Sequence, residues 1–178
     1  MDLRRIKTEE TGITYFWVMN VKKTAWKSYL FWILLTEAVG VLSALLTREG
    51  SELYQTAIQK PPLSPAPIVF PIVWAILYLL MGISAARIWQ TAPSVERTHA
   101  LKLYALQLIF NFFWSVIFFN AEAFLAALIW LIVLWVLILL MVLSMRKLVP
   151  WAGWLQVPYL IWVLFAAYLN AGVWILNR

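Results

Sequence analysis

The chain has 178 residues, of which 64% are hydrophobic and only 12% are charged, and its formal net charge is +6. Soluble domains carry about 25% charged residues, so this composition excludes an ordinary soluble protein and indicates a membrane protein. Cysteine is absent, which excludes disulfides, thiolate catalysis and iron–sulfur ligation. The only histidine, His99, falls in a predicted loop. We therefore expect no metal or histidine-ligated haem site.

Five apolar segments are long enough to cross a bilayer, because a span of the hydrocarbon core takes about 20 helical residues. We predict spans at residues 28–46, 68–89, 103–119, 123–145 and 152–176. The connections are too short to hold a further domain. The predicted fold is an all-α integral membrane bundle of five transmembrane helices in residues 26–178, preceded by a cytoplasmic tail in residues 1–25.

The positive charges are distributed unevenly between the two sides of this bundle. All but three of the 14 Lys and Arg residues precede the first span or lie in the second-to-third and fourth-to-fifth connections, and the exceptions are Arg48, Lys60 and Arg178. Positive residues stay cytoplasmic, which predicts an N-terminus inside and a C-terminus outside. The same distribution explains the net charge without nucleic acid, which we do not expect as a partner.

The first 18 residues are polar and mixed in charge, and no cleavable signal sequence is evident. Two interpretations remain open: an upstream extension before a true start at Met19, or a disordered cytoplasmic tail. The absence of targeting signals favours the bacterial cytoplasmic membrane.

The first span contains a carboxylate, Glu37, whose burial costs a few kcal/mol unless it is partnered or protonated. It is either a group that hydrogen-bonds a neighbouring helix, which we favour, or a ligand-binding or proton-handling group. Gly40 with Ala44, and Gly82 with Ala86 in the second span, have the small-xxx-small spacing of close helix contacts. This spacing is a weak indication of a dimer.

Five prolines fall between Pro61 and Pro71, in the connection from the first span to the second. Proline fixes φ and removes a backbone donor, so a regular helix is excluded until the end of this loop. We interpret the loop as an ordered lid on the outer face. A rigid tether without a role in ligand binding is the alternative.

The second, third and fifth spans each place aromatic or polar side chains on one helical face. These residues are Trp74, Tyr78 and Met81 in the second span, Asn111, Trp114, Ser115 and Phe118 in the third, and Tyr159, Trp162 and Ala166 in the fifth. If the three faces converge, they form a large apolar pocket of the kind that binds small molecules. Aromatic rings stack well on flat conjugated ligands. Asn111 either hydrogen-bonds such a ligand or joins helices to each other.

The fourth span has no polar side chain between Phe124 and Leu143. We expect it to be structural, with Trp130 and Trp135 facing lipid. In the fifth span, Pro158 is expected to kink the helix. The spans hold no Ser-His-Asp set and no paired carboxylates, so conventional hydrolysis has no catalytic groups here.

Three ordered motifs resemble the tryptophan-rich sensory protein/translocator protein family (TspO/MBR, the peripheral benzodiazepine receptor family), in its bacterial type. They are V-F-P-I-V-W-A-I-L-Y-L-L-M-G, Q-L-I-F-N-F-F-W-S-V-I-F-F and P-Y-L-I-W-V-L-F-A-A-Y-L-N, and they follow Lys60-Pro61 and the proline-rich loop. The resemblance covers about residue 26 to the C-terminus. It implies a homodimer of five-helix bundles whose pocket, under the first loop, accepts protoporphyrin-type tetrapyrroles and other flat apolar ligands.

The resemblance also assigns residues. Asn111 matches the pocket asparagine, Trp162 a pocket tryptophan implicated in porphyrin breakdown in some members, and Ala166 a small residue that contacts ligand. The motif aromatics Trp74, Tyr78, Trp114, Tyr159 and Phe165 are less certain contacts. Two departures from the family pattern matter. Leu63 stands where the family loop carries a second tryptophan implicated in that breakdown, and the stretch L-N-A-G-V-W in the fifth span lacks the Tyr and Arg of the sterol motif of animal members.

The sequence therefore favours a membrane binding or sensory protein for porphyrins over an enzyme, and we expect no covalently bound cofactor. Two alternatives stay open. A light-dependent porphyrin-degrading enzyme would use Trp162 as its redox-active residue. A porphyrin or metabolite transporter has Glu37 as its only plausible coupling group and shows no inverted repeat.

Overall fold

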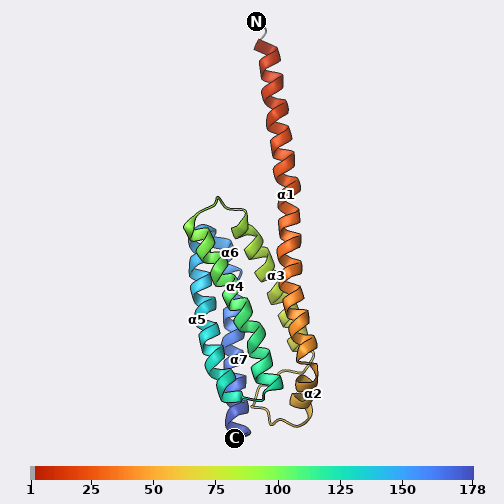
Figure 1. Ribbon diagram of the computed structural model, residues 1–178, viewed down its shortest axis with the longest axis vertical. Helices are drawn as coiled ribbons and strands as arrows, with labels where there is room; N and C mark the ends of the chain where they lie inside the picture. Colours follow the sequence, from red (N-terminus) through yellow and green to blue (C-terminus); the bar gives the residue numbers. More distant parts are fainter. Residues whose placement is uncertain (1–2) are drawn as a thin grey trace.

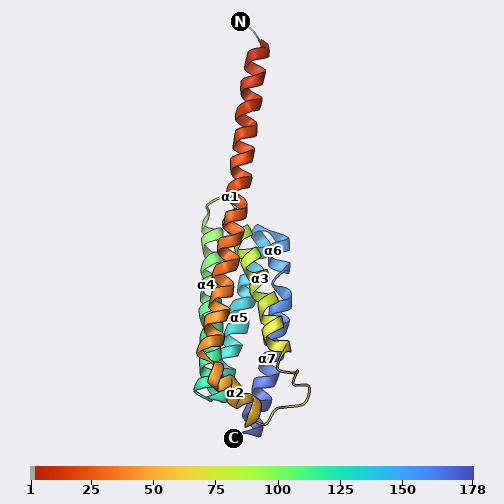
Figure 2. The same cartoon turned by 90° about the vertical axis from the view of Figure 1, so that its right-hand side faces the viewer.

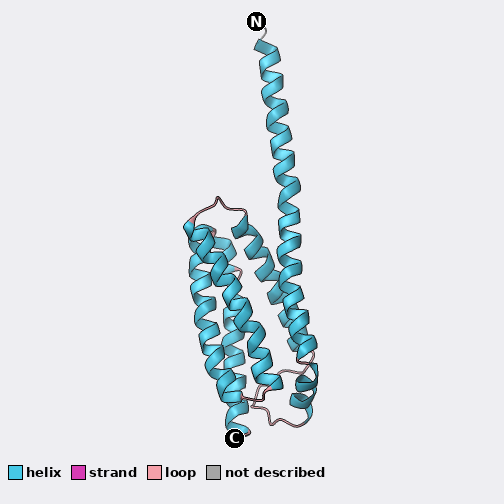
Figure 3. Cartoon of the chain, viewed as in Figure 1, coloured by secondary structure: helices cyan, strands magenta, loops and turns pink. Residues whose placement is uncertain are grey.

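A computed structural model describes residues 3–178, with side chains described from residue 25 onward. Throughout this range the regular structure is helical (Figure 3), which confirms the predicted fold class. The elements in chain order are α1 (Leu3–Leu46), α2 (Arg48–Thr56), α3 (Val69–Trp89), α4 (Val95–Ser115), the π-helix η1 (Val116–Asn120), α5 (Phe124–Leu148), α6 (Pro150–Trp154) and α7 (Val157–Leu176).

In the described chain, five helical stretches are long and apolar enough to cross a membrane, as predicted. They are Ala25–Leu46, Val69–Trp89, Val95–Asn120, Phe124–Leu148 and Pro150–Leu176. The third begins well before its apolar run because Ser94 caps it: the Ser94 hydroxyl accepts a hydrogen bond from the Arg97 backbone N–H at 3.1 Å. The chain termini lie at opposite ends of the molecule (Figure 1), as an odd number of spans requires.

Helix α1 begins at Leu3, and its first part extends beyond the other helices (Figures 1 and 2). This differs from the disordered tail that was one of the two expectations for residues 1–25. The stretch contains no proline and a single glycine, Gly12, so nothing in it stops a helix. The apolar part of α1 starts at Ala25, close to the predicted boundary.

Two glycines allow α1 and α3 to pack closely, and this pair of helices makes the most extensive contact in the bundle. A side chain at Gly40 would collide with the ring of Tyr78, and a side chain at Gly82 would collide with the α1 backbone at Ile33. Gly40, Gly82 and the buried Ala86 therefore serve packing within one chain, whereas Ala44 is exposed. The dimer stays a prediction.

Helix α5 packs against α4, α6 and α7, and its tryptophans do not simply face lipid. Trp130 and Trp135 are half-buried. The Trp130 indole N–H donates to the Phe110 carbonyl at 2.8 Å, and that of Trp135 donates to the Leu160 carbonyl at 3.1 Å. The expectation of two lipid-facing tryptophans holds only in part, because each ring is half-exposed while its indole N–H takes a carbonyl of a neighbouring helix.

The fifth span consists of two helices, α6 and α7, with a turn between them. Pro158 lies in the first turn of α7, where its missing N–H costs nothing, so it starts a helix instead of kinking one. The side chain of Gln156 fills the break. Its Nε2 donates to the Leu80 carbonyl at 3.1 Å and to the Ser84 hydroxyl at 2.7 Å, which ties the break to α3.

Candidate functional site

A chain of hydrogen bonds crosses the middle of the bundle and joins α3, α4 and α7. The Tyr78 hydroxyl donates to Asn111 Oδ1 at 2.7 Å, and Asn111 Nδ2 donates to the Tyr159 hydroxyl at 3.0 Å. The Tyr159 hydroxyl donates in turn to Gln107 Oε1 at 2.9 Å. Asn111, Tyr159 and Gln107 are each at most 1% exposed. Such interhelical bonds fix the register of the helices in an apolar interior.

This network occupies both ends of the Asn111 amide. Its oxygen accepts from Tyr78 and its nitrogen donates to Tyr159, while Trp74 packs against both tyrosine rings, with ring centroids 5.5 and 6.1 Å apart. The structure thus brings Trp74, Tyr78, Asn111 and Tyr159 together, as the sequence predicts. A ligand that hydrogen-bonds Asn111 has to displace one of the two tyrosine hydroxyls.

Beside this network, an open groove of about 640 Å³ runs between α3 and α7. Few backbone positions of α3 lie close to α7, so side chains form the walls of the groove. Its lining is apolar throughout: Val73, Ile76, Leu77 and Leu80 from α3, and Pro158, Ile161, Trp162 and Phe165 from α7. The volume falls within the range of small-molecule sites.

Trp162 is the largest side chain of this groove. Its ring lies edge-on to Phe70, with centroids 6.1 Å apart, and 5.6 Å from the ring of Phe165. Trp162 is half-buried, so part of the indole remains available to a ligand. Ile76 and Ile161, on opposite walls, are 52% and 63% exposed, which leaves the groove accessible from the surface that faces the membrane.

Trp114 and Phe118 belong to a different cluster, nearer the end of the bundle that carries α2. Their rings stack with centroids 5.4 Å apart. The Trp114 indole N–H donates to Asn170 Oδ1 at 3.3 Å, and Asn170 Nδ2 donates to the Phe124 carbonyl at 2.8 Å. Ala166, on the same helix as Asn170, is buried at 9% exposure. None of these residues lines the α3/α7 groove.

The proline-rich loop is held on the end of α7, as an ordered segment would be. The Gln59 backbone N–H donates to Asn177 Oδ1 at 3.0 Å, and Asn177 Nδ2 donates to the Gln59 carbonyl at 2.9 Å. The Tyr168 hydroxyl donates to the Pro62 carbonyl at 2.9 Å. Leu63 lies at the exposed tip, with 81% of its surface accessible and φ at 65°. It is not among the residues that line the groove.

Several residues of this region were not singled out from the sequence. Gln107 lies four residues before Asn111, and that spacing of two amides on one helix face was a usable signal. Asn170, by contrast, stands out in the sequence as a polar group deep in the fifth span. The aliphatic groove walls give no signal, because Val, Ile and Leu facing a ligand look the same as Val, Ile and Leu facing lipid.

Charged and metal-binding groups contribute little to the described part of the chain. No group of three His, Asp or Glu side chains gathers there. Among the described side chains, the ion pair is that of Arg48 with Glu52 at 3.2 Å, outside the spans. Glu37 is half-buried near the middle of the Ala25–Leu46 span of α1. The site region is therefore equipped for apolar contact and neutral hydrogen bonds.

Comparison with known proteins agrees with this architecture. The model of the TspO/MBR family matches residues 32–175. The tryptophan-rich protein TspO of Chlorobaculum tepidum is 36% identical over 141 residues, which cover 79% of this chain and 89% of that protein. The tryptophan-rich sensory protein of Cereibacter sphaeroides is 36% identical over 145 residues, covering 82% and 88%. The translocator protein of Bos taurus is 31% identical over 151 residues, covering 84% and 89%. An integral membrane bundle with this helix order and these matches over most of its length belongs to the TspO/MBR family.

Proposed function

We propose that this protein binds porphyrins and similar flat, apolar molecules within the membrane, and that the groove between α3 and α7 is where they contact it. The single observation that carries the proposal is the groove itself, about 640 Å³ in volume, apolar throughout and walled by the Trp162 indole. A flat conjugated ring gains dispersion contact from such rings over a wide area.

The buried tyrosine and asparagine network supports the same proposal from the inner side. Leu77, a groove residue, is the neighbour in sequence of Tyr78, and Pro158 is the neighbour of Tyr159. A ligand in the groove therefore contacts the turns of α3 and α7 that carry Tyr78 and Tyr159, the two residues that hydrogen-bond Asn111. Polar groups close to an apolar site are what orients a ligand.

The residues favour a protein that binds tetrapyrroles over an enzyme that degrades them. Trp162 puts one oxidisable ring in the groove, but the second tryptophan that the family resemblance implicates in tetrapyrrole breakdown is absent from the loop. The loop offers Leu63, which has no indole and lies 81% exposed at the tip. Illumination of the purified protein with protoporphyrin tests this: porphyrin absorbance should fall no faster with the parent than with Trp162→Phe. Faster loss with the parent would favour the enzyme.

The binding test is a titration with protoporphyrin IX, followed by tryptophan fluorescence, in the same detergent for all variants. Trp162→Ala should weaken binding by about 1–3 kcal/mol, the scale of a buried aromatic contact. Trp26→Ala is the matched control, because Trp26 lies on α1 and is 56% exposed. It should bind as the parent does. Equal affinity of Trp162→Ala and the parent would remove the groove from the function.

A further inference from the structure

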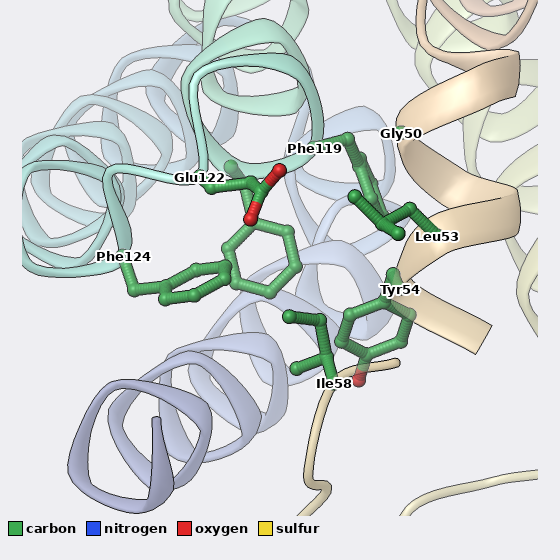
Figure 4. Close-up of a pocket in the computed structure, with 8 residues that line it drawn as sticks. Gly50, Leu53, Tyr54, Ile58, Phe119, Glu122 and Phe124 are labelled. Atoms are coloured by element: carbon green, nitrogen blue, oxygen red, sulfur yellow. The ribbon is translucent and has the colours of Figure 1, made fainter. Parts of the chain in front are cut away.

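The proline-rich loop, residues 57–68, begins at a closely packed junction between α2 and the turn that joins α4 to α5. Figure 4 shows Tyr54 of α2 and Ile58 of the loop on one side of this junction and Phe124 on the other. The Tyr54 ring lies 5.6 Å from that of Phe119 and is perpendicular to it at 88°. This packing fixes the place from which the loop leaves α2.

Beyond the junction the loop runs back along α7. Three contacts mark its path in order: Gln59 with Asn177, Pro61 with Gly172, and Pro62 with Tyr168. The middle contact is so close that a side chain at Gly172 would collide with the Pro61 ring. From Asn177 to Tyr168 is nine residues, about 13 Å along a helix. The loop therefore returns toward the middle of the bundle beside the C-terminal part of α7 (Figure 2).

An aromatic residue near the end of α7 shows how far this return path enters the membrane. The Arg178 guanidinium lies 5.7 Å from the centre of the Trp174 ring, and a tryptophan beside a basic residue is typical of the headgroup level. Tyr168 lies six residues closer to the middle of the span, about 9 Å along the helix. The headgroup layer is about 5–7 Å deep on each side of the hydrocarbon core. Tyr168 and the loop segment that it holds therefore lie where the acyl chains begin.

The backbone of the loop suits such surroundings. Four of the seven residues 61–67 are prolines, which have no N–H. Three carbonyls of this segment have donors: Pro61 accepts from the Ser64 hydroxyl at 2.8 Å, Pro62 from the Tyr168 hydroxyl at 2.9 Å, and Ala66 from the Val69 N–H at 2.9 Å. Unpaired backbone groups are what makes irregular chain costly among acyl chains, and these features lower that cost.

The side chains that the loop exposes are apolar. Leu63 is 81% exposed, Ile68 is 64% exposed, and Leu63 has φ at 65°, a left-handed conformation that leucine seldom adopts. The sequence has no charged residue between Lys60 and Arg87. The Lys60 ammonium is turned back to α2, where it donates to the Gln55 carbonyl at 2.7 Å. Water is a poor solvent for such a tip, whereas acyl chains solvate it well.

We propose that the tip of this loop inserts into the lipid leaflet at the α2 end of the bundle, with the side chains of Leu63 and Ile68 among the acyl chains. The partner is the lipid itself, and the loop anchors this end of the protein instead of facing water. The anchor borders the α3/α7 groove, because the ring of Tyr168 stacks on the groove residue Phe165 with centroids 6.1 Å apart. It does not depend on the proposed porphyrin binding.

The test uses single cysteines in the full chain, which has none of its own. Each variant carries a nitroxide spin label in lipid nanodiscs, and power-saturation EPR compares its access to oxygen, which dissolves in lipid, with its access to a water-soluble nickel complex. Leu63→Cys should favour oxygen, as should the lipid-facing reference Ile132→Cys on α5, where Ile132 is 54% exposed. Gln55→Cys, at an exposed position of α2, is the matched control and should favour nickel.

A second measurement avoids the apolar label. The charged thiol reagent sulfonatoethyl methanethiosulfonate should modify unlabelled Leu63→Cys and Ile68→Cys at least about tenfold more slowly than Gln55→Cys, because a thiolate forms poorly in apolar surroundings. Circular dichroism checks that each variant keeps its helices. Greater access to nickel at Leu63→Cys, or thiol reaction as fast as at Gln55→Cys, would place the loop in water and overturn the proposal. Low access to both oxygen and nickel would show that a second copy of the chain covers the tip, which overturns it as well.

Discussion

Tyr159→Phe is the sharpest probe of the buried network, because it removes one oxygen and leaves the ring in place. That hydroxyl accepts from Asn111 Nδ2 at 3.0 Å and donates to Gln107 Oε1 at 2.9 Å. Its loss leaves two buried polar groups without these partners. Interhelical hydrogen bonds in membranes contribute about 0.6–1.7 kcal/mol each, so the unfolding free energy should fall by about 1–3 kcal/mol.

The assay is equilibrium unfolding in mixed micelles with increasing SDS, followed by the helical circular dichroism signal. Tyr168→Phe is the matched control, because Tyr168 is 43% exposed and its hydroxyl makes one bond, to the Pro62 carbonyl. That change should cost about 0.5 kcal/mol or less, since water can replace the lost partner. If Tyr159→Phe is no more destabilising than Tyr168→Phe, the network does not stabilise the bundle and the reasoning fails.

Three further outcomes follow from the packing and from the loop. Gly82→Ala should destabilise by about 1–3 kcal/mol in the same assay, because its methyl would collide with the α1 backbone at Ile33; a neutral effect would mean that α1 and α3 separate freely. Asn177→Ala should speed hydrogen exchange of the Gln59 amide about tenfold, since that N–H loses its acceptor, while Tyr159 and its surroundings keep their protection. Trp135→Phe should cost about 1 kcal/mol by removing its bond to the Leu160 carbonyl, and no loss would return Trp135 to the lipid-facing surface.

The helices could be predicted from the sequence because hydropathy over about 20 residues is a strong signal. The third span was placed too late, since its first two turns are polar and their helical start depends on the Ser94 cap. The break near Gln156 was taken for a kink at Pro158. Whether a proline bends a helix or begins one depends on where the helix before it ends, and the apolar composition on both sides hides that point.

The candidate site was predicted in part. Helical spacing placed Tyr78, Asn111 and Tyr159 on inward faces, and the structure joins them by hydrogen bonds. The same spacing grouped Trp162 with Tyr159, but the two residues point to different surroundings, the groove and the core. Three residues turn a helix by about 300°. Tyr159 and Trp162 therefore share one broad face of α7 but pack against different parts of the bundle.

The open side of the groove has a consequence for how affinity should be expressed. In a bilayer, the empty site is wetted by flexible acyl chains, which are as apolar as the side chains of its walls. A ligand of the proposed kind would compete with these chains for the site. Its transfer from lipid to the groove would gain little hydrophobic free energy, because both surroundings are apolar. Rigid planar molecules hold an entropic advantage in this exchange, since they lose less internal freedom on confinement. Dissociation constants should therefore scale with the mole fraction of ligand in the membrane and change with the lipid.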